Sequence, residues 1–253
     1  MNRSRGSAGR VLISDYDGTL APFRIDRMKA VPYPGVVERL AGILDCGGRI
    51  VLVTGRPARE LTEIFPLARR LEVWGAHGFE RRMPDGRVIR HPLPEPVSRG
   101  LDTAIEICRG MGLSRRTERK YGSVALHLRG LDPKDALSIE REVYAEWSNS
   151  VAGTGLEVRC FDGGIELLAG GRDKGSAVDT VLRETSETTA AAYLGDDQTD
   201  EDAFRAIRGR GLGVLVRLER RTTAAELWLK PPEELIEFLQ NWKAAVCDER
   251  THN

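Results

Sequence analysis

Acidic side chains follow two apolar runs of this chain at the point where each run ends. Asp15 and Asp17 come directly after residues 11–14, and residues 190–194 precede a second acidic group: Asp196, Asp197 and Asp200. A carboxylate can attack as a nucleophile, and a neighbouring carboxyl group can transfer a proton. Several carboxylates in one place repel each other unless a cation neutralises them, and oxygen ligands without His or Cys favour Mg²⁺. The acids therefore predict a magnesium site that could support group transfer.

Residue types that bind anions stand at two further places. Thr54, Gly55 and Arg56 follow a third apolar run, and Lys174 opens a segment with helical apolar spacing. A hydroxyl and a buried ammonium could hold the oxygens of a phosphoryl group. Structural roles are the alternatives: Thr54 could cap the next helix, Lys174 could be a surface lysine, and Asp200 could cap a helix of its own.

Apolar strands and amphipathic helices alternate through most of the chain and would position these side chains. Such connections imply a parallel sheet with helices on both faces, and the loops beyond the carboxyl ends of its strands form one crevice. The predicted strands are 11–14, 50–53, 71–74, 190–194 and 212–216, and the predicted helices lie near 34–46, 57–65, 174–184 and 235–242.

The pattern changes between residues 79 and 169, which we predict to be an inserted α+β domain. It begins with a hairpin near 81–92 and contains two helices and three further strands. Strand 123–129 alternates, which places His127 and Arg129 on one face and apolar residues on the other. The predicted division is a disordered N-terminus (1–10), a core domain (11–78 and 170–245), the inserted domain (79–169) and a C-terminal tail (246–253).

Composition excludes several classes of partner. The 38 basic and 38 acidic residues give a formal net charge of zero, which argues against nucleic acid or an anionic membrane as the main partner. No apolar run approaches the roughly 18 residues that cross a bilayer, and the N-terminus lacks the apolar stretch of a signal peptide. The four cysteines are scattered, so we expect buried thiols in a reducing compartment and a cytoplasmic protein.

The order of the motifs resembles the haloacid dehalogenase-type phosphatase superfamily. Asp-Tyr-Asp-Gly-Thr, a strand ending in Thr, a lysine opening a helix and Gly-Asp-Asp-Gln-Thr-Asp occur in that sequence across the chain outside the insertion. The resemblance implies an α/β fold: a Rossmann-like core with a parallel sheet and an inserted α+β cap domain. It also implies Asp15 as the nucleophile that forms an aspartyl phosphate, and Asp17 as the acid/base.

The same resemblance implies roles for the surrounding residues. Mg²⁺ would bind the Asp15 and Asp196 carboxylates and the Asp17 backbone carbonyl. Thr54 and Lys174 would hold the phosphoryl oxygens, together with backbone amides of the tight turn at Gly18. Asp197 and Asp200 would orient a magnesium-bound water or the lysine, from outside the immediate ligand set.

A closer resemblance is to the trehalose-6-phosphate phosphatases. Its strings are DYDGTLAPF from Asp15, TGR from Thr54, GAHG from Gly75, GDDQTDEDAF from Gly195 and, in the insertion, ERKYGSVALHLR from Glu118. The insertion would be a mobile cap that closes over the crevice. The implied substrate-binding residues are Gly18, Gly55, Arg56, His77, Glu118, Lys120, His127, Arg129 and Glu166. A solvated charged strand face is the alternative for the cap residues.

One segment departs from that family. Where a Glu-x-Arg-Pro stretch is usual, this chain reads Glu166-Leu-Leu-Ala169, so the Arg and Pro are missing; Arg159 and Arg172 are candidates to compensate. The expected substrate is a small sugar phosphate, first trehalose 6-phosphate. The alternatives are another glycosyl phosphate such as glucosyl- or mannosyl-3-phosphoglycerate, a phosphomutase, or a metal-binding regulator without turnover. In trehalose synthesis, the preceding glucosyl transfer would belong to a separate glycosyltransferase.

Overall fold

An eight-stranded sheet forms the centre of the molecule in the computed structural model, which describes residues 9–24, 26–161 and 163–251. The strand order is β12-β11-β10-β1-β2-β3-β4-β5. Strands β12 to β3 pair in parallel, and β4 and β5 are antiparallel additions at one edge. The strands are β1 (Arg10–Ser14), β2 (Arg49–Val53), β3 (Glu72–Gly75), β4 (Glu80–Arg82), β5 (Val88–Arg90), β10 (Ala190–Gly195), β11 (Leu212–Val216) and β12 (Leu227–Leu229).

Alternate residues of the central strands enter two separate apolar cores. Leu12 and Leu52 pack with helices on one face of the sheet, whereas Val11, Ile13 and Val51 pack with helices on the other. This is the parallel sheet with two covered faces that the sequence pattern predicts. The first face carries α1 (Val36–Asp45), α2 (Ala58–Ile64) and α7 (Glu233–Thr251), and the second carries α5 (Lys174–Arg183) and α6 (Glu201–Ile207).

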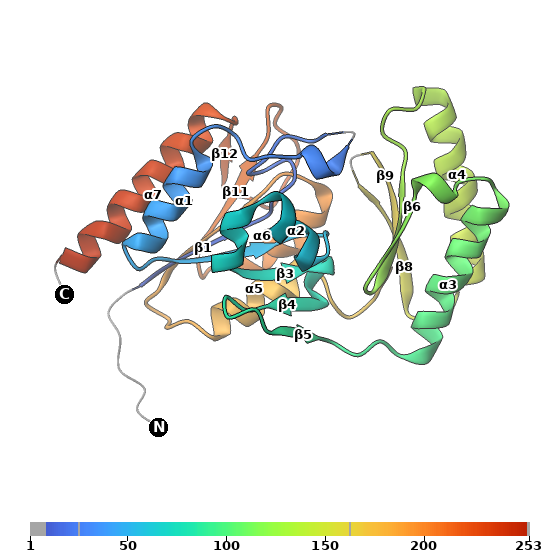
Figure 1. The fold of residues 1–253 in the computed structure, drawn as a ribbon, viewed down its shortest axis with the longest axis horizontal. Helices are drawn as coiled ribbons and strands as arrows, with labels where there is room; N and C mark the ends of the chain where they lie inside the picture. The colour runs from blue at the N-terminus through green and yellow to red at the C-terminus, as the bar shows by residue number, and fades with distance from the viewer. Residues whose placement is uncertain (1–8, 25, 162, 252–253) are drawn as a thin grey trace.

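The inserted cap is a four-stranded antiparallel sheet in the order β6-β7-β9-β8, backed by two helices. Figure 1 shows this sheet beside the core, with both helices on its outer side. Val124, Leu126 and Ile165 join the apolar cluster that also holds residues of the two helices. Glu118, Ala125, Glu166 and Arg159 are register partners across the four strands, so they share the face toward the core. The elements are α3 (Glu95–Gly110), β6 (Thr117–Lys120), β7 (Ser123–His127), α4 (Pro133–Ser150), β8 (Leu156–Phe161) and β9 (Gly164–Ala169).

Short 3-10 helices occupy several of the connections. Four of them carry residues that line the site described below: η1 (Arg27–Lys29), η3 (Ala76–Gly78), η4 (Ser114–Arg116) and η5 (Gln198–Asp200). A further 3-10 helix is η2 (Pro66–Arg70).

Three predicted boundaries need correction. The hairpin of β4 and β5 belongs to the core sheet, because Glu80–Arg82 pairs with the otherwise open edge of β3, so the cap begins after Arg90. The predicted C-terminal tail is helical to Thr251, since α7 continues along α1. Residues 1–8 of the predicted disordered N-terminus lie outside the described residues, and Arg10 already begins β1.

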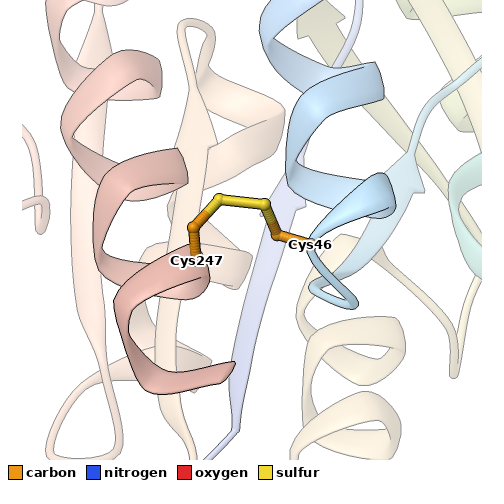
Figure 2. Close-up of a disulfide and its surroundings, with 2 residues drawn as sticks. All are labelled: Cys46 and Cys247. Carbon is orange, nitrogen blue, oxygen red and sulfur yellow. A yellow bond between two sulfur atoms is a disulfide. The ribbon is translucent and has the colours of Figure 1, made fainter. Parts of the chain in front are cut away.

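A disulfide joins the ends of α1 and α7. Cys46, the residue that ends α1, bonds to Cys247 of α7 across a sequence separation of 201 residues (Figure 2). The expectation of four free thiols is therefore wrong for this pair, because the two helices pack side by side and bring distant cysteines together. Cys108 is free and buried, and Cys160 is free but exposed. Disulfides are typical of oxidising compartments, and a cytoplasmic location stays a prediction from the sequence alone.

Within the described residues, no helix is both long and apolar enough to cross a membrane.

Candidate active site

Asp15 and Asp196 meet because their strands are neighbours. Asp15 follows β1 and donates its backbone N–H to the carbonyl of Leu194 in β10 at 2.8 Å. Asp196 follows the end of β10, so the two carboxylates leave the same edge of the sheet. Together with Asp200, they offer three ligand oxygens that all lie within 4.8 Å of one another. The side chains are buried, and Thr19 donates its hydroxyl to Asp196 Oδ1 at 3.2 Å.

Lys174 supplies a positive charge beside these acids. It is the first residue of α5, whose N-terminus is fixed by a capping box between Asp173 and Ser176. Its Nζ lies 3.1 Å from Asp15 Oδ1 and 2.8 Å from Asp200 Oδ1. The lysine is 3% exposed, so the structure excludes the alternative of a surface lysine.

Four donors surround the Asp200 carboxylate. Lys174 and the Tyr193 hydroxyl donate to Oδ1, and the backbone N–H groups of Asp196 and Asp197 donate to Oδ2. No side-chain cap to α6 is present, although Asp200 occupies the capping position. With its lone pairs engaged in this way, Asp200 holds the loop that presents Asp196 and orients Lys174.

Burial makes this group of acids costly to ionise together. It raises the pKa of Asp15 to about 7, with further repulsion from Asp200 and partial relief from Lys174. Burial, followed by repulsion from Asp200 and Asp15, also raises the pKa of Asp196. A bound cation would relieve this repulsion, and a donor set made of carboxylate oxygens matches Mg²⁺ chemistry. The residues present therefore fit a divalent metal ion, which would be held by Asp15 and Asp196.

Asp17 lies next to this cluster but pairs with a different cation. Arg56 Nε and Nη2 donate to the two Asp17 carboxylate oxygens at 2.6 and 2.7 Å, a bidentate ion pair. Thr54 Oγ1 accepts the Arg56 backbone N–H at 3.1 Å, so this threonine shapes the turn that carries the arginine. Thr54 also lines the cavity described below, where its hydroxyl proton can face a ligand.

Two glycines allow close approaches. Gly18 has φ +84°, and a Cβ there would lie 2.2 Å from Asp196 Oδ2. A Cβ on Gly55 would lie 2.7 Å from two ring atoms of His77. These predicted residues therefore act by being small: one leaves room for the metal-ligand candidate and the other for the histidine.

A cavity of about 450 Å³ lies between the core edge and the cap sheet. Thirteen of the predicted residues line it, and the other three, Gly18, Asp196 and Asp200, are not among its lining residues. From the core come Asp15, Asp17, Thr54, Gly55, Arg56, His77, Lys174 and Asp197, and from the cap come Glu118, Lys120, His127, Arg129 and Glu166.

Glu166 already contacts three side chains of the protein. His77 Nε2 lies 2.8 Å from its Oε2, and Lys120 Nζ and Ser123 Oγ donate to its Oε1 at 2.8 and 2.7 Å. Burial opposes ionisation of Glu166, but the charges of Lys120 and His77 lower its pKa well below the usual value. Glu166 thus joins the cap to the core. It does so although the segment 166–169 lacks the Arg and Pro that are usual in the family that the sequence resembles.

The other cap residues form a polar wall. His127 Nε2 lies 2.9 Å from Glu118 Oε2, and the Arg129 guanidinium stacks on Phe23 of the core at 4.4 Å from the ring centre. Burial would raise the pKa of Glu118, but His127, Lys120 and Arg27 lower it to about 2. Arg159, a candidate to replace the missing arginine, pairs instead with Asp202 of α6 at 2.8 Å.

Sequence reasoning missed a further set of cavity residues. They come from the segment after β1, from η5 of the core, and from η4, the edge strands β6 and β8 and the turn before β9 in the cap. No periodic pattern in the sequence marks these side chains as facing the cavity. The sequence did offer two indications of these residues: the basic pair Arg115 and Arg116 before β6, and the arginines Arg24 and Arg27 after the DYDGTLAPF motif. The set is Phe23, Arg24, Arg27, Arg115, Arg116, Thr117, Phe161, Gly163 and Thr199.

Comparisons with known proteins agree with this architecture. The family model described as trehalose-phosphatase matches residues 13–229. A probable trehalose-phosphate phosphatase I of Arabidopsis thaliana is 28% identical over 276 residues, covering 96% of this chain and 70% of the relative. A trehalose-phosphate phosphatase of Mycobacterium ulcerans is 30% identical over 238 residues, covering 88% of this chain and 59% of the relative.

Solved structures show the same fold. The C-terminal domain of Candida albicans trehalose-6-phosphate phosphatase superposes with a TM-score of 0.80 at 21% identity, covering 94% of this chain and 93% of that one. A trehalose-6-phosphate phosphatase related protein gives 0.73 at 25% identity, with coverage of 94% and 99%. The predicted α/β core with an inserted cap is confirmed, and the chain belongs to the trehalose-phosphatase family, whose members are phosphoric monoester hydrolases.

Proposed function

We propose that this protein hydrolyses trehalose 6-phosphate to trehalose and phosphate. The observation that carries the proposal is the buried Asp15, which faces a cavity of about 450 Å³ with Lys174 at 3.1 Å and Asp17 on the same loop. The polar cap wall of Glu118, His127 and Arg129 supports a hydroxyl-rich substrate, and family membership supports the disaccharide. A separate glycosyltransferase that supplies the substrate and a cytoplasmic location remain part of the proposal.

In the proposed mechanism, an Asp15 carboxylate oxygen attacks phosphorus while the bond from phosphorus to the sugar oxygen breaks. Asp17 gives its proton to the departing sugar oxygen. A water then attacks the aspartyl phosphate, Asp17 takes a proton from that water, and phosphate leaves with Asp15 restored. Lys174 and Thr54 hold the phosphoryl oxygens, and the cap excludes bulk water from the first step. Mg²⁺, bound by Asp15, the Asp17 carbonyl and Asp196, would offset the repulsion between nucleophile and phosphate.

The test is phosphate release with Mg²⁺ from a panel of sugar phosphates, comparing wild type with Asp15→Asn. The amide is nearly the same shape as the carboxylate but a poor nucleophile, so we expect turnover to fall by at least about 10³-fold with the fold intact. Asp179→Asn, on the exposed face of α5, is the matched control and should keep full activity.

Selective release from trehalose 6-phosphate is the expected result. Release from glucosyl- or mannosyl-3-phosphoglycerate, with trehalose 6-phosphate refused, would overturn the substrate and keep the chemistry. Full activity of Asp15→Asn would remove this residue from the mechanism.

A further inference from the structure

Arg27 joins the cap to the core beside the cavity. It begins η1, in the core loop that follows β1, and its N-cap residue Asp26 accepts the Met28 backbone N–H at 3.1 Å. One guanidinium nitrogen of Arg27 contacts Glu60 of α2 at 2.5 Å, and the other contacts Glu118 of the cap strand β6. The guanidinium therefore lies between a carboxylate of the core and a carboxylate of the cap.

The same arginine also contacts the group that holds Asp17. Arg56 Nη2 donates to the Arg27 backbone carbonyl at 2.8 Å, and Arg56 Nη1 donates to Glu60. Glu60 is thus shared, with one carboxylate oxygen on each arginine. Arg56 in turn binds both oxygens of Asp17. A continuous chain of contacts runs from the cap carboxylate through Arg27, Glu60 and Arg56 to the proposed acid/base.

We propose that Arg27 is a positioning residue that makes the orientation of Asp17 depend on the closed position of the cap. The proposal rests on the proposed function, in which Asp17 protonates the departing sugar oxygen. When the cap is closed, Glu118 holds one side of the Arg27 guanidinium and Glu60 remains available to Arg56. When Glu118 moves away, the Arg27 guanidinium keeps only Glu60 of these two carboxylate partners. The segment of η1, whose Arg27 carbonyl accepts the hydrogen bond from Arg56 Nη2, is then held less firmly. Arg56 then loses support on the side opposite Asp17, and the acid is less well placed.

A positioning role can be told apart from substrate recognition and from a general loss of stability. Only the positioning role makes the loss of rate depend on the leaving group of the ester. A general acid matters most for an ester whose alcohol is a poor leaving group, and little for an activated aryl ester. Small esters lack the sugar that the cap wall is proposed to recognise, so a change in sugar recognition should not affect them. A pair of small substrates, an alkyl phosphate such as glycerol 2-phosphate and an aryl phosphate such as p-nitrophenyl phosphate, therefore isolates the placement of Asp17.

The experiment measures kcat and KM for both small esters in the full-length protein with Mg²⁺, for wild type, Arg27→Gln and Arg27→Lys. Lys29→Gln is the matched control, because it removes the same charge two residues away, from a side chain that is 79% exposed. Asp17→Asn is the reference variant, which shows how the rates on the two esters change when the general acid is lost. We expect Arg27→Gln to lower kcat for the alkyl ester by about tenfold and for the aryl ester by less than about twofold, with KM little changed. Arg27→Lys should recover part of the loss, and Lys29→Gln should match wild type.

Two results would overturn the proposal. An equal loss on both esters would show that Arg27 acts through the general structure of the site. Wild-type rates on both esters would show that Asp17 does not depend on this arginine. If wild type releases phosphate from none of the substrates, the proposed function itself fails, which is a distinct result.

Discussion

Lys174 is the residue on which the buried acids depend when no metal is bound. Its ammonium contacts Asp15 and Asp200, and their charges raise its pKa although burial opposes this. Removing one partner from a buried group of charges costs roughly 3–5 kcal/mol, because the remaining charges lose their compensation.

We expect Lys174→Met to lower the free energy of unfolding by about 3 kcal/mol without Mg²⁺, and by clearly less with Mg²⁺, because the cation replaces part of the lost charge. Urea denaturation followed by circular dichroism, with and without the metal, measures both values. Phosphatase activity should fall at least about 100-fold in either case. Equal destabilisation with and without Mg²⁺ would contradict this account of the lysine.

Glu166 offers a second residue-scale test, which depends on pH. Its pKa is lowered well below 4.5, so its ionised form stabilises the folded protein fully above about pH 4.5 and loses that contribution as pH falls further. Glu166→Gln should therefore cost about 3 kcal/mol of stability at pH 7, and the difference from wild type should narrow below pH 4.5. Urea titrations at pH 7 and pH 4 measure the two differences, and a constant difference would refute the ion pairs with Lys120 and His77.

At the residue scale, the sequence predicted which residues lie close together in the site, but not which hydrogen-bond donors each carboxylate accepts. Asp15, Asp196 and Lys174 could be placed together because each stands at the end of a strand or the start of a helix. The sequence could not show that Asp200 is saturated by four donors or that Glu166 is taken by His77, Lys120 and Ser123. Those contacts come from segments far apart in the chain, and residue type alone does not choose among partners.

The turn after β1 is the element that sets the spacing between nucleophile and metal ligand. Gly18 adopts φ +84°, and its missing side chain leaves the space that Asp196 Oδ2 occupies. Gly18→Ala would add backbone strain and also displace Asp196. Since misplacement of a catalytic group by about 1 Å can cost 10²-fold, we expect activity to fall by about that factor and the Mg²⁺ concentration for half-maximal activity to rise.

Gly86→Ala separates the two effects. Gly86, in the turn between β4 and β5, has φ +89°, and a Cβ there meets nothing within 4 Å. The backbone cost should therefore be similar in both variants, about 1 kcal/mol or somewhat more, without a change in metal dependence for Gly86→Ala. If both variants lose activity equally, contact with Asp196 is not the reason.

Elements were predicted better than their boundaries. The apolar runs 11–14, 50–53 and 190–194 are strands of one parallel sheet because each is short, apolar and followed by a loop residue. The sequence places the hairpin near 81–92 in the cap because the alternation of strands and helices ends near residue 79. Its place in the core follows from pairing with the edge of β3, which the local pattern does not reveal.

At the scale of the whole molecule, ion pairs on different sides of the cavity link the cap to the core, in addition to the buried contact between Glu166 and His77. Arg27 contacts Glu118, and Arg159 contacts Asp202. The first joins the cap sheet to the loop after β1, and the second joins it to α6. Both lie at least partly exposed to water, where such pairs contribute little, so they can separate when the cap opens to admit substrate.

The disulfide constrains most of the chain, because Cys46 and Cys247 are 201 residues apart in the sequence. Closing so long a loop limits the unfolded ensemble and stabilises the folded state by about 3–5 kcal/mol in the chain-entropy account. Cys46 precedes β2, so the bond lies near the amino ends of the strands, at the opposite edge of the sheet from Thr54 and the cavity. Its loss should therefore change stability far more than catalysis.

We expect the double variant Cys46→Ser, Cys247→Ser to lose about 3–5 kcal/mol of unfolding free energy while keeping its kcat for trehalose 6-phosphate within about twofold. Cys160→Ser, which removes an exposed free thiol, is the matched control and should behave as wild type. A reductant should destabilise wild type and the control to the level of the double variant, and leave the double variant unchanged. If reductant and double substitution both leave the stability of the chain unaltered, the two helices hold together by apolar packing alone. If they lower kcat as strongly as stability, the edge of the sheet near Cys46 is coupled to the crevice, and the separation argued from the strand direction is wrong.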